Sequence, residues 1–369
     1  MKKQKKLVAV VFFALSAVFG LSAVVPSDRQ KSGNNNKQGL KDTIFTEDIG
    51  KYMISRAAEK MPMREKWLKI DSSLRTHIGE RIVNGVYIGE ERLLDTGFSE
   101  RKEISEAAEC INSFASGYNG TLYIAAVPSS SGVYGDILPE YLLGDTENQQ
   151  ISRLYDSLGS NIRKIDAYNI LKMLKDNYIY YRNDTKWTSY GAYCVYRTVI
   201  QKLGFQPTAY DKYTIRHVAD NFRGSLYART LASDTMADLI DIYEYPDGAQ
   251  VISCMTANEN GHIHECSFYD MDKLSSGDMY KMYLGEEAPV IEIETNVNNE
   301  RRLLVIKDSY ANCFIPFLTQ HFNRITVVSP EYMEGPLSEN IDVSEYEQTL
   351  MLFGVENTDR PELFSCIAY

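Results

Sequence analysis

The chain has 369 residues, of which 44% are hydrophobic and 24% are charged, so it has the composition of a folded globular protein, and wholesale disorder is excluded. Its length allows one large domain or two of ordinary size. The formal net charge is −11, and because basic residues outnumber acidic ones as far as Lys41, the rest of the chain is more acidic still. This charge excludes nucleic acid and other anionic polymers as partners that are held by charge alone.

The N-terminal segment predicts where the protein is located. Four lysines precede the uncharged run Leu7–Val25, which as a helix would span about 28 Å, close to the thickness of a bilayer core. These features predict an uncleaved signal anchor over residues 1–26, with the body of the protein outside the cytoplasm. A cleaved signal peptide, and hence a secreted protein, is the alternative, although a cut after Ala23 would put Leu21 where a small side chain is preferred. A buried core helix is a third alternative.

Residues 27–41 are rich in Ser, Asn, Gln, Lys and Gly, which is typical of a flexible tether between a membrane and a folded body. No fixed-period repeat, second linker or second bilayer-length apolar run follows, so residues 42–369 are expected to form one domain and the chain to cross a membrane once at most. The six cysteines form no C-x-x-C motif. Cys254 and Cys266 could pair outside the cytoplasm; the alternative is that they are small buried hydrophobes.

Short, continuous apolar runs predict strands that are covered on both faces of a sheet. Four runs have this character: Leu122–Val127, Leu303–Ile306, Ile325–Val328 and Thr349–Val355. Apolar residues at helical spacing, followed by a glycine, predict helices over residues 151–158 and 187–203. Buried strands that alternate with helices predict an α/β fold with a mostly parallel sheet in three layers.

The segment after the Leu303–Ile306 strand has the pattern of a catalytic turn. The strand ends at Lys307, and Asp308 and Ser309 follow in a turn before a predicted helix whose first turn contains Pro316. A hydroxyl there would stand at the carboxyl end of a parallel strand, where α/β folds place their sites, and a helix N-terminus would favour a developing oxyanion. The alternative is a helix cap formed by Asp308 and Ser309 without any chemistry.

A second polar cluster, Y-I-Y-Y-R-N-D-T-K-W-T-S-Y-G-A-Y, runs from Tyr178 to Tyr193. Asp184 and Lys186 place a carboxylate and an ammonium group two residues apart, just before a helix whose apolar face Trp187 is expected to enter. The alternative is a helix-start acid, a solvated lysine and a core tryptophan. The residues by themselves leave both interpretations open.

Three motifs follow one another along the chain: Y-Y-R-N-D-T-K-W-T-S-Y-G-A-Y from Tyr180, D-N-F-R-G-S-L-Y from Asp220, and V-I-K-D-S-Y-A-N-C-F-I-P-F-L from Val305. Together with V-P-S from Val127 and the anchor-plus-tether N-terminus, they resemble the DHHW family, which belongs with the SGNH-hydrolase-like proteins related to the alginate O-acetyltransferases. The similarity covers most of the chain after the tether. It implies a flavodoxin-like α/β/α fold outside the cytoplasm and a Ser-His-Asp acyl-transfer site.

Carried over residue by residue, the resemblance implies that Ser309 is the nucleophile and that Asp184 orients the base. The leading glycine of the family's G-D-S motif is Lys307 here, and the family's Asp-His-His-Trp reads Asp-Thr-Lys-Trp, so the catalytic histidine position holds Lys186. A lysine with an ordinary pKa near 10.4 is protonated at pH 7 and cannot activate a serine. Burial would have to lower that pKa, and Asp184 would oppose the change. The base is thus Lys186 or a histidine from elsewhere in the chain.

We expect four residues that flank these positions to contact substrate: Trp187, Asp308, Tyr310 and Asn312. The expected function is O-acetylation of an envelope or secreted polysaccharide, by acyl transfer or ester hydrolysis. The resemblance implies an integral-membrane acyltransferase as the acetyl donor. The alternative is an inactive glycan-binding or scaffold component of the same pathway, because the motif histidine is Lys186. No metal or nucleotide cofactor is expected, since no ligand spacing and no phosphate-cradling glycine loop is present.

Overall fold

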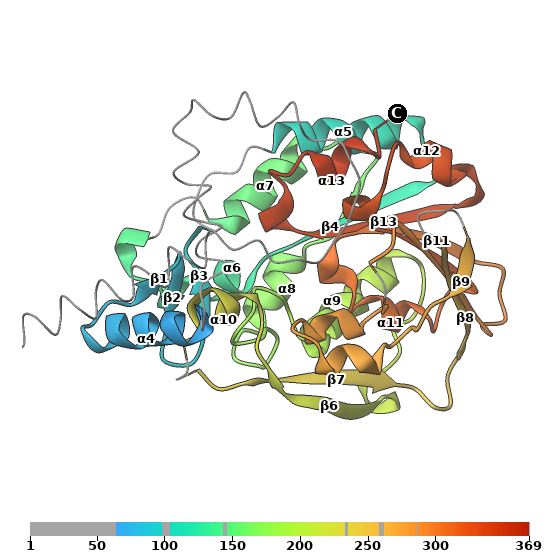
Figure 1. Ribbon diagram of the computed structural model, residues 1–369. Coiled ribbons are helices and arrows are strands. Elements are labelled where there is room, and N and C mark those ends of the chain that lie inside the picture. Colours follow the sequence, from blue (N-terminus) through green and yellow to red (C-terminus); the bar gives the residue numbers. More distant parts are fainter. Residues whose placement is uncertain are drawn as a thin grey trace, which may run out of the picture. The chain divides into compact units, whose positions relative to one another are not determined.

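The computed structural model (Figure 1) describes residues 64–97, 104–142, 146–232, 235–257, 262–285 and 287–368. The predicted anchor and tether lie outside these residues. The chain divides into two units between Leu74 and Arg75; residues 64–74 of the first unit are described, within helix α4 (Arg64–His77), and every sheet belongs to the second unit. No helix of the described ranges is both long enough and apolar enough to cross a membrane.

The centre of the second unit is an eight-stranded sheet, and the predicted apolar runs form four of its strands. In spatial order its strands are β5 (Arg163–Lys164), β4 (Thr121–Val127), β13 (Gln348–Gly354), β11 (Arg302–Lys307), β12 (Arg324–Val328), β10 (Val290–Thr295), β8 (Val251–Ala257) and β9 (Ile263–Glu265). The first five strands are parallel, and β10, β8 and β9 continue the sheet in antiparallel fashion. The prediction of an α/β fold with a mostly parallel sheet is confirmed, and the four predicted strands are β4, β11, β12 and β13.

Both faces of the parallel strands are buried, because successive side chains of a strand point to opposite faces and both sets are apolar here. In β11, Leu303 and Val305 belong to one core cluster, whereas Leu304 and Ile306 belong to another. One face is covered by α5 (Ser105–Gly117), α7 (Glu147–Ser157) and α13 (Glu362–Ser365), and the other by α8 (Ala167–Met173), α9 (Ser189–Lys202) and α11 (Ile315–Leu318), as Figure 1 shows. The polar turn that contains Asp308 and Ser309 follows the carboxyl end of β11.

The two predicted helices are present, with one correction. Residues 151–158 form the second half of α7 and its C-terminal cap. Trp187 was expected on the apolar face of α9. It lies before the start of this helix instead and forms a β-bridge with Tyr180. The helix starts two residues later because Thr188 has an extended backbone and its hydroxyl accepts the backbone N–H of Gly191.

The remaining elements surround this sheet. The other helices are α6 (Ser130–Tyr134), α10 (Ser225–Thr230) and α12 (Leu337–Asn340). A three-stranded antiparallel sheet consists of β1 (Ile82–Val83), β2 (Val86–Ile88) and β3 (Leu93–Asp95), and a two-stranded one consists of β6 (Thr214–Phe222) and β7 (Asp238–Glu244). Four short 3-10 helices border the site described below: η7 (Met279–Met282), η8 (Ser309–Ala311), η9 (Pro330–Tyr332) and η11 (Val355–Asn357).

Candidate active site

The carboxylate of Asp308 holds the turn that carries Ser309. Asp308 directly follows β11, and its Oδ1 accepts the backbone N–H of Tyr310 at 2.8 Å. Its Oδ2 accepts the backbone N–H of Gly354 at 2.7 Å and the Nδ2 group of Asn357 at 2.8 Å, at the end of the neighbouring strand β13. Asp308 therefore joins the carboxyl ends of two parallel strands, and its carboxylate positions the turn.

A 3-10 turn, and not an α-helix, begins at Ser309. After η8 the chain forms only the four-residue helix α11, which has Pro316 in its first turn, as predicted. The expectation that a helix dipole at Ser309 would support an oxyanion is wrong, because the aligned peptide groups of a longer helix are missing. The turn offers instead the backbone N–H of Ser309, which has no acceptor in the described ranges.

Ser309 lies on the wall of a cavity of about 180 Å³. Its side chain is partly exposed, and no described residue forms a hydrogen bond with its hydroxyl group. Other walls of the cavity come from distant parts of the chain and include Lys186 before α9, Tyr280 in η7, Lys307 at the end of β11 and Asn312 after η8. The structure thus brings Ser309 and Lys186 to one cavity.

Asp184 does not line this cavity but holds the ammonium group of Lys186, which does. Lys186 Nζ lies 3.6 Å from Asp184 Oδ1, which also accepts the backbone N–H of Lys186 at 3.0 Å. Asp184 Oδ2 accepts the backbone N–H of Ser225 at 2.6 Å. A Cβ atom at Gly224 would lie 2.2 Å from this oxygen, so only glycine fits there. The G-S pair of the D-N-F-R-G-S-L-Y motif therefore positions Asp184.

The charges around Lys186 keep it protonated. Burial alone would lower the pKa of the Lys186 ammonium group, but the surrounding carboxylates, first Asp184 and then Glu356, outweigh burial and raise that pKa. Burial also acts to raise the pKa of Asp184, and the charge of Lys186 together with two backbone N–H groups lowers it. At neutral pH the two residues form an ion pair, so Lys186 can stabilise negative charge but cannot accept a proton.

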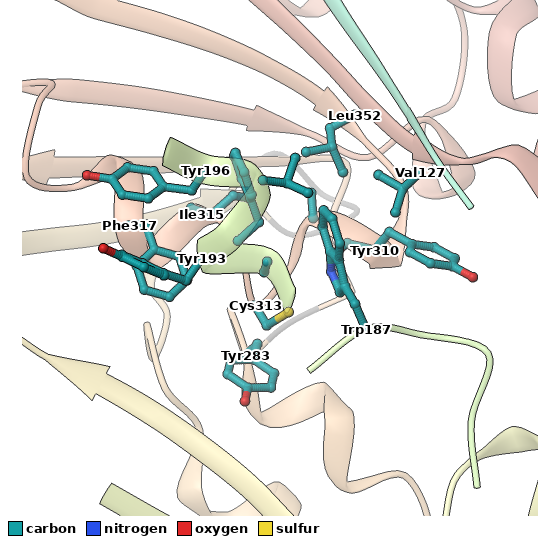
Figure 2. Packing of buried hydrophobic residues seen from close by; sticks show 14 of the residues in the cluster. Val127, Trp187, Tyr193, Tyr196, Tyr283, Tyr310, Cys313, Ile315, Phe317 and Leu352 are labelled. Atoms are coloured by element: carbon teal, nitrogen blue, oxygen red, sulfur yellow. The ribbon is translucent and has the colours of Figure 1, made fainter. Parts of the chain in front are cut away.

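Trp187 and Tyr310 are buried and connect the two motif segments behind the cavity. The indole Nε1 of Trp187 donates a hydrogen bond to the backbone oxygen of Tyr310 at 2.8 Å, and the hydroxyl of Tyr310 donates to the backbone oxygen of Thr185 at 3.2 Å. Figure 2 shows the Trp187 indole beside Tyr310, with Cys313 on its other side. Neither Trp187 nor Tyr310 lines the cavity, whereas Asp308 and Asn312, the other two expected substrate contacts, do.

The comparisons with known proteins show which family the chain belongs to. The model of the DHHW protein family matches residues 76–328. The chain belongs to the DHHW family. The resemblance inferred from the three motifs is therefore confirmed. No curated protein matches the chain.

Several solved structures are similar to this DHHW-family chain. A DHHW family protein from Eubacterium siraeum has 22% sequence identity and a TM-score of 0.66, over 77% of this chain and 96% of that one. PatB1 from Bacillus cereus, solved with a sulfonyl adduct, has 19% identity and a TM-score of 0.64, over 75% of this chain and 97% of that one. The O-acetyltransferase domain of Pseudomonas putida AlgJ is more distant, with 14% identity and a TM-score of 0.47, over 77% of this chain and 99% of that one.

No histidine takes the place that Lys186 occupies in the DHHW motif. His321 Nε2 lies 2.6 Å from the hydroxyl of Tyr196, and burial lowers the pKa of His321 to about 4. His217 lies in β6, where its Nδ1 is 2.5 Å from a carboxylate oxygen of Asp241. None of the histidines in the described part of the chain lines the cavity of Ser309.

Lys307 also lies at this site, although the sequence motifs predicted no role for it. Its Nζ donates a hydrogen bond to Asn312 Oδ1 at 2.7 Å. Burial lowers the pKa of Lys307 to about 8, against the opposing effect of carboxylates, of which Asp308 is the strongest. The signal in the sequence was a lysine that closes the apolar run L-L-V-I-K, since a lysine at the end of a strand covered on both faces is partly removed from water.

Proposed function

We propose that this DHHW-family chain transfers or hydrolyses O-acetyl esters of an envelope or secreted polysaccharide, with Ser309 as the nucleophile. The observation that carries the proposal is the partly exposed hydroxyl of Ser309, in a cavity that Lys186 and Asn312 also line. A hydroxyl next to groups that stabilise negative charge is the arrangement that acyl transfer requires. The family to which the chain belongs supports the same chemistry.

In the proposed reaction, Ser309 Oγ attacks the carbonyl carbon of an acetyl ester and forms a tetrahedral intermediate. The negatively charged oxygen of this intermediate would be stabilised by the backbone N–H of Ser309, by Nδ2 of Asn312 and by the ammonium group of Lys186. Asn312 accepts from Lys307 with its oxygen, so its Nδ2 group is available as a donor. Collapse expels the alcohol and leaves the acetyl group on Ser309. A sugar hydroxyl or a water molecule accepts the acetyl group in the second step.

The charge of the cavity favours a neutral ester. Its wall contains three lysines and four carboxylates: Lys186, Lys281, Lys307, Asp278, Glu287, Asp308 and Glu331. An anionic polymer would therefore gain no net electrostatic attraction at this site. The rings of Tyr280 and Tyr332, which also line the cavity, give it apolar surface of the kind that binds the faces of sugar rings.

The proposal includes the architecture and the location of the protein. We infer a three-layer SGNH-hydrolase-like arrangement, which the helices on both faces of the central sheet support. We also infer an extracytoplasmic body, held by the N-terminal anchor and tether, that receives acetyl groups from an integral-membrane acyltransferase. The lysines before Leu7–Val25 and the length of that run support the anchor.

A serine-directed probe tests the proposed nucleophile. The full-length chain in detergent is incubated with a fluorophosphonate and, separately, with 4-nitrophenyl acetate. We expect the label on Ser309, and we expect Ser309→Ala to lose both labelling and ester hydrolysis. Ser329→Ala is the matched control, because Ser329 also lines the cavity and should leave both reactions intact. Equal labelling of wild type and Ser309→Ala would refute the proposal.

A non-catalytic glycan-binding or scaffold component is the second candidate. The protonated Lys186 at the position of the motif histidine favours it. This candidate predicts that the wild-type chain does not react with the probe, that Lys186→His gains Ser309-dependent labelling, and that Ser309→Ala leaves glycan binding unchanged. Labelling of the wild-type chain at Ser309 would exclude it.

A further inference from the structure

Lys307 and Ser309 line the same cavity. Asp308, which lies between them, has an extended backbone with φ −103° and ψ −170°. Side chains on either side of an extended residue project in the same direction, from Cα atoms about 7 Å apart. The long side chain of Lys307 can cover that separation, so its amine is within reach of the space in front of the Ser309 hydroxyl.

The surroundings of Lys307 differ from those of Lys186. Lys307 is 9% exposed, and its Nζ donates to the neutral amide oxygen of Asn312, while no carboxylate in the described ranges forms an ion pair with it. Lys186 is held by the buried carboxylate of Asp184. A buried lysine without a carboxylate partner is the one whose charged form is penalised. Of the two lysines beside Ser309, Lys307 is therefore the one that can present a neutral amine.

We propose that Lys307 is the general base that takes the proton from Ser309 Oγ, in place of the histidine that the DHHW motif lacks in this chain. This inference rests on the proposed function of Ser309. Asn312 accepts one N–H of the amine and so holds the nitrogen in place, which leaves the lone pair of Nζ for the serine proton. Lys186 keeps its own charge and serves the oxyanion.

The proton and electron movements balance within the chain and the ester. As the bond between Ser309 Oγ and the acetyl carbon forms, the O–H bond breaks, its proton moves to Lys307 Nζ, and the carbonyl electron pair moves to the carbonyl oxygen. When the intermediate collapses, the bond to the leaving alcohol breaks. The alcohol oxygen then takes the proton from the Lys307 ammonium group, and the amine is regenerated for the second step.

The groups that face Lys307 support this role. Besides Lys307, nine titratable side chains line the same cavity: Lys186, Asp278, Tyr280, Lys281, Tyr283, Glu287, Asp308, Glu331 and Tyr332. The carboxylates among them that act on Lys307, with Asp308 first, raise its pKa, but burial outweighs them and leaves the pKa at about 8. A base with such a pKa is half neutral near pH 8, close to the range in which general bases work best.

Two substitutions at Lys307 test the inference in the full-length chain. Lys307→Met keeps much of the side-chain volume without an amine, and Lys307→Arg keeps a permanent charge that cannot be lost. We expect both to slow fluorophosphonate labelling of Ser309 and acetyl-enzyme formation at least about 100-fold, the lower limit for loss of a general base. Lys172→Met, in α8 and hydrogen-bonded to Val133, is the control and should react like wild type.

The pH profile and a rescue separate a base from a structural residue. In wild type, the labelling rate should rise with pH and level off above about 8, the pKa of Lys307. The labelling rate of Lys307→Met should not show this dependence on pH. Ethylamine added to Lys307→Ala should restore labelling, with a rate that follows the fraction of neutral ethylamine, which a folding defect cannot imitate.

The outcomes distinguish this inference from the proposed function. Labelling that depends on Ser309 but keeps the wild-type rate and pH profile in Lys307→Met would overturn the role of Lys307 and leave the proposed function standing. A wild-type chain without any Ser309-dependent reaction would overturn both.

Discussion

The indole Nε1 of Trp187 donates a hydrogen bond at 2.8 Å to the backbone oxygen of Tyr310, the residue that follows Ser309. Both side chains are almost completely buried, and the Trp187 ring is stacked on Phe314 with centroids 6.2 Å apart. This contact joins the loop that holds Lys186 to the turn that holds Ser309. The relative positions of the two motifs therefore depend on a buried tryptophan outside the cavity.

Trp187→Phe should lower the stability of the protein and also slow the reaction of Ser309. The substitution leaves the buried backbone oxygen of Tyr310 without this donor, which costs about 1–3 kcal/mol of the free energy of unfolding, in addition to the lost packing. We expect a lower midpoint in urea denaturation and slower labelling of Ser309 in the fraction that stays folded. Phe314→Leu, which removes the stacked ring but keeps the hydrogen bond, should lose stability while the folded fraction keeps its labelling rate. Equal labelling in all three proteins would contradict the coupling.

Asp184→Asn should reduce stability in a pH-dependent way. The pKa of Asp184 is lowered in the folded state, so its ionised form stabilises the fold above the ordinary pKa of about 3.9, and this contribution is lost as the pH falls through the lowered pKa. Leaving the largely buried side chain of Lys186, which is 19% exposed, without its partner should lower the free energy of unfolding at pH 7 by up to about 3–5 kcal/mol. Urea denaturation at pH 7 and pH 3 should show a difference between variant and wild type that shrinks in acid.

The control for Asp184 is Asp136→Asn, which removes an exposed carboxylate that lies 2.6 Å from Lys175 Nζ. Exposed ion pairs contribute roughly 0–1 kcal/mol, so this variant should remain close to wild type at both pH values. A loss at pH 7 as large as that of Asp184→Asn would mean that burial of the pair is not the cause.

Glu147→Gln should stabilise the protein at alkaline pH. Glu147 is buried beside Ser129, which donates its backbone N–H and its hydroxyl to the two carboxylate oxygens at 2.6 Å each, and burial raises the pKa of Glu147 to about 8. A raised pKa means that the folded state favours the protonated acid, so stability falls from about pH 4.3, the ordinary pKa, up to about pH 8 and then levels off.

Thermal or urea unfolding between pH 4 and 9 measures this effect. The gain of Glu147→Gln over wild type should grow across that range to several kcal/mol, since each unit of pKa difference corresponds to about 1.4 kcal/mol. Glu90→Gln, at an exposed position, should leave the pH dependence unchanged. A gain that is the same at every pH would show that ionisation of Glu147 is not responsible.

Cys254 and Cys266 should be joined by a disulfide in the protein isolated without reductant. Cys254 lies in β8 and Cys266 directly follows β9, with their sulfur atoms 2.9 Å apart. Cys266 donates its backbone N–H to the backbone oxygen of Cys254 at 2.8 Å. Only a small side-chain movement separates this geometry from that of a disulfide. The measurement is intact mass after alkylation in denaturant: both residues should escape alkylation unless a reductant is added, whereas Cys313 should be modified in either case. Alkylation of both without reductant would refute the pairing.

The sequence predicted those parts of the protein that depend on neighbouring residues along the chain. Continuous apolar runs identified β4, β11, β12 and β13, because a strand buried on both faces needs such a run. The end of one run located the Ser309 turn, and three ordered motifs identified the family. The helix with Pro316 in its first turn is present, but the expected helix dipole at Ser309 is not, because Asp308 holds a 3-10 turn there through Tyr310. The sequence around Asp308 does not show that its carboxylate also binds Gly354 and Asn357 at the end of β13.

Only the tertiary structure distinguished the two lysines. Lys186 and Lys307 each lie within two residues of an aspartate, so the chain around them presents the same pair of residue types. The fold buries Asp184 against Lys186 and raises the pKa of that lysine, whereas it directs the Asp308 carboxylate to the backbone of β13 and leaves Lys307 with a neutral amide. The sign of a pKa shift depends on which remote groups replace water around a charge, and residues far apart in the chain supply those groups.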